Sequence, residues 1–77
     1  MSEYIIKTKK ANIDYINKII EAQEGMAKVR TLNSEEGLIK ILTNNFFLED
    51  VEAILEKLKK HSIEIEILEK REWHGVL

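Results

Sequence analysis

The stretch from residue 26 to residue 42 constrains the fold most, because it holds two runs of alternating side chains around a polar turn. In the first run, Lys28 and Arg30 alternate with small or apolar residues, as in a strand with one solvent-exposed face. The second run, residues 38–42, repeats the alternation. Residues 33–37, N-S-E-E-G, supply turn formers and a glycine for a positive φ, so the stretch predicts an antiparallel hairpin. A lone hairpin is marginal in water, so flanking segments must cover its apolar face.

The segment before the hairpin predicts one strand and one helix. Residues 3–8 alternate as a strand does. Isoleucines then recur at spacings of three and four after Asn12, a good N-cap residue, and Gly25 is placed to stop the helix. We therefore expect a helix from about residue 13 to residue 24.

The segment after the hairpin predicts a second helix and a last strand. Residues 43–45, T-N-N, form a loop that can cap a helix. The apolar stripe that follows has acidic residues near its start and lysines near its end, which complement the helix dipole. Residues 62–68 then alternate, with Ile63, Ile65 and Ile67 expected to point inward.

These elements follow the order βαββαβ, the ferredoxin-like split βαβ arrangement. Right-handed crossovers then give an α+β sandwich, in which two helices cover one face of an antiparallel four-stranded sheet of order 4-1-3-2. We expect this domain to span residues 1–68, and the C-terminal tail, residues 69–77, to pack on the domain or on a partner. The expected core comprises Tyr4, Ile6, Ile16, Ile20, Val29, Ile39, Ile41, Val51, Ile54, Leu58, Ile63, Ile65 and Ile67.

Composition narrows the class of function. A chain of 77 residues forms one domain, and its lack of cysteine excludes disulfides and thiolate zinc sites and suits the cytoplasm. No apolar run approaches the length of a membrane span. The net charge of -2 differs from the strongly positive charge that is typical of nucleic-acid-binding proteins. His61 and His74 lack metal-ligand spacing, and no nucleophile, base and orienting residue form a recognisable set. We therefore expect a cytoplasmic protein that is not an enzyme and uses no cofactor or metal.

The face of the sheet away from the helices is the most informative surface. It should display large aliphatic side chains and charged ones together: Ile5, Lys7, Lys28, Arg30, Leu32, Leu38, Lys40, Leu42, Glu64 and Glu66. One interpretation is a solvated face with cross-strand ion pairs between Lys7 and the glutamates. The other is that Ile5, Leu32, Leu38 and Leu42 form an interface, either in a homo-oligomer such as a dimer or under the tail with Trp73.

Arg30 also has two interpretations. It can anchor a carboxylate or phosphate in bidentate fashion, with Lys7, Lys28 and Lys40 as companions, and so bind a small anionic metabolite. Alternatively, it forms an ion pair with Glu24, Glu36 or an acid of a partner subunit.

The run E-G-M-A-K-V-R-T-L at residues 24–32, followed by an acidic turn and a glycine, resembles a small family of uncharacterised prokaryotic domains. That resemblance covers about residues 4–68, and it supports the fold and the domain limits without implying a function. A looser resemblance is to ACT-type regulatory domains, which bind amino acids near a glycine in the loop after the first strand. Here that loop, residues 9–12, is K-K-A-N and has no glycine. RNA-recognition domains share the topology, but they stack bases on aromatic residues that this sheet face lacks.

Three functions remain as hypotheses. The first is a non-enzymatic, oligomeric ligand-sensing module of ACT-like regulatory type. The second is a protein-interaction module that uses the open sheet face and Trp73. The third is weak nucleic-acid binding through the lysines and arginine of the sheet.

Overall fold

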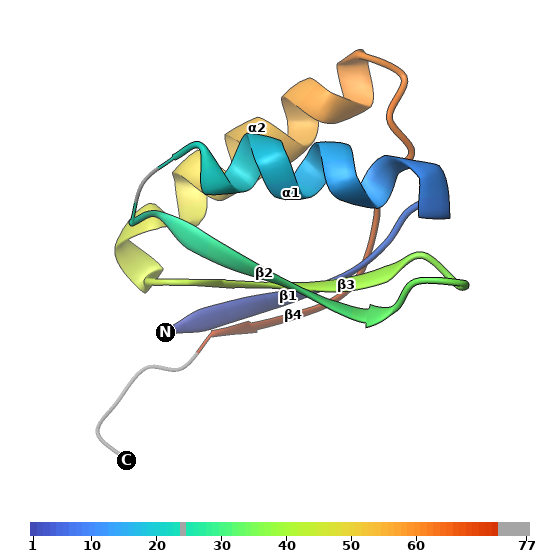
Figure 1. The fold of residues 1–77 in the computed structure, drawn as a ribbon. Helices are drawn as coiled ribbons and strands as arrows, with labels where there is room; N and C mark the ends of the chain where they lie inside the picture. The colour runs from blue at the N-terminus through green and yellow to red at the C-terminus, as the bar shows by residue number, and fades with distance from the viewer. Residues whose placement is uncertain (24, 73–77) are drawn as a thin grey trace.

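The computed structural model describes residues 1–23 and 25–72, and it has the predicted α+β architecture (Figure 1). Its four strands form one antiparallel sheet of order β2-β3-β1-β4, which is the predicted order read from the other edge. Both helices lie on the same side of that sheet and leave its other side open. The strands are β1 (Ser2–Lys7), β2 (Ala27–Asn33), β3 (Leu38–Thr43) and β4 (Glu66–Glu72), and the helices are α1 (Ile13–Glu21) and α2 (Leu48–Lys60), each preceded by a 3-10 turn, η1 (Lys10–Asn12) and η2 (Asn45–Phe47).

The core lies between the sheet and the two helices. Every second residue of the central strands points into it, so Tyr4, Ile6, Ile39 and Ile41 are fully buried. Each helix adds a stripe at helical spacing: Ile13, Ile16 and Ile20 from α1, and Val51, Leu55 and Leu58 from α2. Of the other predicted core residues, Ile65 is buried and Val29, Ile54 and Ile63 are partly buried, whereas Ile67 is 41% exposed on the edge strand β4.

Helix α1 is shorter than predicted. It ends at Glu21, and the N–H of Gln23 then bonds to the Ile20 carbonyl at 3.1 Å as the chain turns. Ile20 is the last residue of the buried stripe, so no apolar side chain beyond it holds another turn against the sheet. Gly25 does adopt a positive φ of 75°, but it lies in the connection to β2 rather than directly after the helix.

Strand β4 begins four residues later than predicted, at Glu66. The N–H of Ser62 bonds to the Lys59 carbonyl and that of Ile63 to the Leu58 carbonyl, at 3.1 and 3.0 Å, which is the Schellman pattern that closes a helix. Ser62 takes the left-handed position at φ 66°, where glycine is usual. The alternation of residues 62–65 therefore belongs to this helix stop and to the segment that leads into β4.

The strand continues to Glu72, so the predicted domain boundary at residue 68 falls inside β4. Residues 69–72, which were assigned to the tail, are part of the sheet. The remainder of the predicted tail, including Trp73 and His74, lies outside the described residues.

The hairpin of β2 and β3 forms as predicted, with Gly37 at a φ of 71° in its turn. The Thr8 N–H bonds to the Gly37 carbonyl at 2.8 Å, which fastens the turn to the end of β1. The β2–β3 register shifts between Thr31 and Asn33, so Leu32 occupies a bulge and is 51% exposed. Within the described residues, no helix combines the length and the hydrophobicity that crossing a membrane requires.

Candidate functional site

The open face of the sheet is organised in three rows across the strands. Glu3, Ile5 and Lys7 alternate with the buried Tyr4 and Ile6, so they lie on the side away from the helices. The register extends each of them into a row of facing residues. The rows are Lys28–Leu42–Glu3–Arg71, then Arg30–Lys40–Ile5–Glu69, and then Asn33–Leu38–Lys7–Glu66.

The central row holds a juxtaposition that a stable sheet ordinarily avoids. Arg30 of β2 lies directly opposite Lys40 of β3, although like charges at facing positions destabilise a sheet. Lys40 has a carboxylate nearby, since its Nζ lies 3.5 Å from Glu3 Oε2. Among residues 1–23 and 25–72, by contrast, no carboxylate forms an ion pair with Arg30 or with Lys28.

The sequence offered two acids of the same chain as partners for Arg30. Glu24 lies outside the described residues. Glu36 lies in the hairpin turn and forms no ion pair with Arg30 among the described residues. The contacts of that turn include an ion pair between Lys10 and Glu35 at 2.7 Å and a hydrogen bond from the Glu36 N–H to Asn33 Oδ1.

Glu3 forms ion pairs with a cation on each neighbouring strand, Lys40 of β3 and Arg71 of β4. Its side chain is only 10% exposed, and Arg71 Nη1 lies 3.1 Å from its Oε1. Arg71 Nε also contacts Glu69 at 2.7 Å. Charge on this face is therefore divided: Glu3 of β1 and Glu69 of β4 pair with Arg71 and Lys40, whereas the edge strand β2 presents Lys28 and Arg30.

Lys28 and Arg30 line a surface hollow at the edge of the sheet. It measures about 400 Å³ and is bounded also by Met1, Leu42 and the β3 end at Thr43. The structure thus gathers three of the four predicted ligand-binding residues, namely Lys28, Arg30 and Lys40, on the β2–β3 half. The fourth, Lys7, lies one row further on, opposite Leu38 and Glu66.

The predicted interface residues fall into three groups. Ile5, Leu38 and Leu42 are half-buried on the open face, between the charged side chains. Leu32 sits at the bulge, and Trp73 lies outside the described residues.

Sequence reasoning missed Glu3, Glu69 and Arg71 as members of this face. Period-2 alternation from Tyr4 places Glu3 with Ile5, so that signal was present. Glu69 and Arg71 were missed because residues 69–72 were assigned to the tail.

A second polar cluster lies on the helical side of the sheet. The buried Tyr4 hydroxyl donates to Glu52 Oε2 of α2 at 2.6 Å, and Lys70 Nζ contacts the same oxygen at 2.9 Å. Lys70 also lies 5.8 Å from the centre of the Tyr4 ring, in cation–π geometry. The Tyr4 hydrogen bond first, and the Lys70 hydrogen bond second, hold the pKa of the Glu52 carboxyl below its ordinary value of 4.5. All the charges of this cluster are satisfied within the chain, so it ties β1 and β4 to α2.

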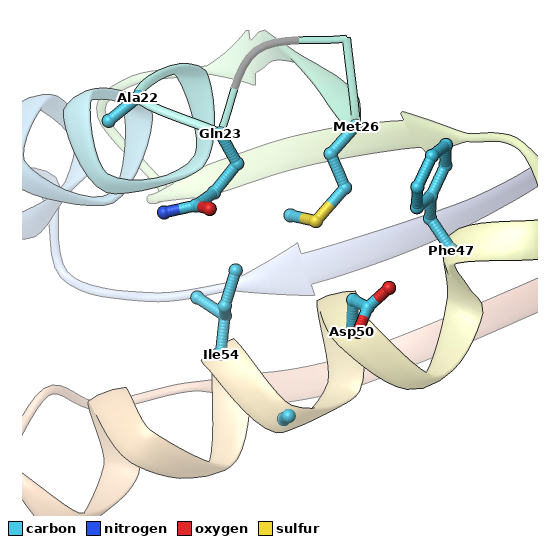
Figure 2. Close-up of a pocket in the computed structure, with 7 residues that line it drawn as sticks. Ala22, Gln23, Met26, Phe47, Asp50 and Ile54 are labelled. Atoms are coloured by element: carbon cyan, nitrogen blue, oxygen red, sulfur yellow. The ribbon is translucent and has the colours of Figure 1, made fainter.

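A hollow of about 510 Å³ lies between the end of α1 and the start of α2 (Figure 2). Gln23 and Met26 point into it from one side, and Ile54 points toward them from α2. Its charged group is Asp50, which lies in the first turn of α2 and interacts favourably with the helix dipole there. The helix dipole therefore accounts for an acidic residue at position 50 without a ligand. This hollow is a weaker candidate for a binding site than the open sheet face.

Comparison with known proteins bears on the family rather than on the activity. Neither the curated proteins nor the solved structures give a match to this chain. A family model described as a domain of unknown function, DUF4911, matches residues 6–61. That match spans α1, the β2–β3 hairpin and α2, and includes the Arg30–Lys40 pair. The chain therefore belongs to the DUF4911 family.

Proposed function

We propose that this domain is a non-enzymatic, ligand-sensing module that binds a small molecule with two or more anionic oxygens on its open sheet face. The observation that supports this proposal is the facing pair of Arg30 and Lys40, two cations held opposite each other by the strand register. An anion between them would turn a repulsive pair into a chelating one. On the other half of the face, Glu3 and Glu69 are paired with Arg71, so the β2–β3 half is the better place for an exogenous anion.

The side chains suit such a ligand. Arginine presents a planar fork that donates two parallel hydrogen bonds to a carboxylate or phosphate, and lysine adds a point charge with three donors. Leu42 beside Lys28 and Ile5 beside Lys40 offer apolar contact for the body of a metabolite. A nucleic-acid backbone fits less well, because the same face carries Glu66 and Glu69 along β4.

Thermal unfolding tests the proposal. Inorganic phosphate and citrate should each raise the Tm of the full chain above its value in sodium chloride of equal ionic strength. A ligand that binds only the native state at 100 times its Kd adds about 2.7 kcal/mol to the free energy of unfolding. Arg30→Gln should remove most of that increase.

Lys18→Gln is the matched control, because it removes the same charge from an exposed position on α1, across the molecule from the open face. It should leave the response to both anions unchanged. Equal losses in Arg30→Gln and Lys18→Gln would mean that the anions act on net charge alone. No response in the unaltered chain would reject the proposal outright.

A further inference from the structure

We infer that the open sheet face binds a second copy of this chain, and that the two copies share the anion between their Arg30–Lys40 pairs. The two-fold axis would lie in the plane of the interface, perpendicular to the strands, and pass through the Ile5 row. The shared anion rests on the proposed function, whereas the placement of the second copy rests on the register of the sheet.

The rows on either side of Ile5 are complementary to each other. An axis through Ile5 exchanges the Glu3 row with the Lys7 row of the second copy. Glu3 then faces the partner's Lys7, and Arg71 faces the partner's Glu66, so opposite charges meet. Leu42 faces the partner's Leu38, so the half-buried aliphatic side chains meet as well.

The central row meets itself. Ile5 lies on the partner's Ile5 near the axis, which buries the one aliphatic side chain of that row. The Arg30–Lys40 pair lies over the partner's pair, and packed sheets are only about 10 Å apart. Glu69 likewise lies over the partner's Glu69, but each is paired with Arg71 of its own copy. Each Lys40 is paired with Glu3 of its own copy, but two Arg30 guanidinium groups at that spacing repel each other unless an anion lies between them. This arrangement therefore favours the ligand that each copy alone only partly surrounds.

The other symmetric arrangement, with the axis parallel to the strands, fits less well. It brings Arg30 to the partner's Glu69, which is favourable. However, it sets Lys28 against the partner's Arg71 and buries Leu42 against the partner's Glu3. An aliphatic side chain then desolvates a carboxylate instead of another aliphatic side chain, which is costly.

The size of the face makes association conditional. Four strands about 4.8 Å apart and six or seven residues long, at about 3.4 Å per residue, cover on the order of 400 Å². Stable specific interfaces bury about 800 Å² per partner. Apolar burial alone would therefore give a weak dimer, and the bridging anion would decide whether it forms.

The first experiment measures the molar mass of the unaltered full chain by sedimentation at several protein concentrations. Phosphate and citrate are each compared with sodium chloride of equal ionic strength. We expect the dimer to form at a protein concentration at least tenfold lower in whichever of the two anions raises the Tm. Comparing the phosphate and citrate results shows which anionic group the site prefers.

The second experiment fixes the orientation, and the absence of native cysteine makes it clean. Leu42→Cys and Leu38→Cys are made as separate full-length variants and treated with a short bis-maleimide in the presence of the anion. A bis-maleimide is used because facing sheets are too far apart for a disulfide. In the inferred dimer the two cysteines face each other, so an equimolar mixture should cross-link while each variant alone should not.

Each other outcome overturns part of the inference. Self-cross-linking of Leu42→Cys alone would indicate the axis parallel to the strands, because that axis places each row over the same row of the partner and so brings the two Leu42 positions near each other. A chain that stays monomeric while an anion still raises its Tm would reject the second copy and leave anion binding standing. A dimer that forms equally well without phosphate or citrate would reject the shared anion, and an unchanged Tm in the same samples would then reject the proposed function too.

Discussion

The two faces of the sheet are made from the same strands but differ in how completely the chain satisfies them. On the helical face, Tyr4 and Ile6 are fully buried, and the Tyr4 and Thr43 hydroxyls donate to Glu52 and to the Met26 carbonyl, respectively. On the open face, Arg30 lies opposite Lys40 and, unlike Lys40, forms no ion pair with a carboxylate of the described residues. The first face thus accounts for folding, whereas the second retains an unfavourable juxtaposition that folding does not require.

The largest effect should come from truncating the helical face. Ile6→Ala leaves a cavity in a fully buried site and should lower the free energy of unfolding by about 2–5 kcal/mol. The control is Ile5→Ala. Ile5 precedes Ile6 on the same strand but faces the open side, so this change should lower the free energy of unfolding by less than about 1.5 kcal/mol in dilute buffer. Urea unfolding followed by circular dichroism compares them. Equal losses would contradict the distinction between the two faces.

The next effect concerns the turn that fixes the β2–β3 hairpin and with it the Arg30–Lys40 pair. A Cβ added at Gly37 would lie 1.8 Å from the Thr8 carbonyl oxygen, at a φ of 71° that side chains rarely adopt. Gly37→Ala should therefore destabilise by more than about 2 kcal/mol, beyond the left-handed penalty of about 1–2 kcal/mol. Gly25→Ala has a similar φ but open space around it, so it should cost only that penalty. Thermal unfolding of both variants measures the difference, and equal costs would mean that the turn yields to the clash.

A smaller, pH-dependent effect should mark the satisfied cluster on the helical face. The pKa of Glu52 is lowered in the folded chain, so its contribution to stability is present above pH 4.5 and is lost as the pH falls through the lowered pKa. The contribution should be below about 1 kcal/mol, because Glu52 is 45% exposed and water screens the pair with Lys70.

Urea unfolding at pH 7 and at pH 3 measures this contribution in Glu52→Gln, which should lose less stability on acidification than the unaltered chain. Glu56→Gln, on the same helix, is the control, since Glu56 is 66% exposed and pairs only locally with Lys59. A larger change in Glu56→Gln than in Glu52→Gln would contradict the assignment.

The smallest effect should have the opposite sign. Arg30→Thr removes the repulsion with Lys40 and should stabilise the chain by about 0.5 kcal/mol in dilute buffer, while abolishing its response to phosphate and citrate. Lys28→Thr is made in the same edge strand but opposite Leu42, so it tests the gain from threonine's strand preference alone. Chemical unfolding should rank Arg30→Thr above Lys28→Thr. A destabilised Arg30→Thr would mean that the arginine serves the fold.

The sequence was sufficient for the topology because period-2 and helical spacings were unambiguous in five of the six predicted elements. The predicted start of the last strand was wrong because Ser62 takes a left-handed position, where glycine usually marks the end of a helix. Ile63 therefore looked like the first inward residue of a strand, although it completes the stop of α2.

For the site, the sequence predicted which residues share the open face but not which of them face each other across the strands. Alternation placed Lys28, Arg30 and Lys40 on the open side, but only the register reveals that Arg30 faces Lys40. Register depends on the hairpin turn, which was predicted, and on the bulge at Leu32, which no regular sequence pattern reveals. The pairing of Arg71 with Glu3 could not be foreseen once residues 69–72 had been taken out of the sheet.

The proposed function depends on anion binding by the β2–β3 half of the open face. The most direct test is a titration of the full-length, isotopically labelled chain with phosphate and with citrate at constant ionic strength, followed through its backbone amide signals. We predict saturable shifts at Lys28, Arg30 and Lys40, while Gln23 and Asp50, which line the hollow between the helices, stay unmoved. Shifts centred on Gln23 and Asp50, or none that saturate, would show that the β2–β3 half of the open face is not the anion site.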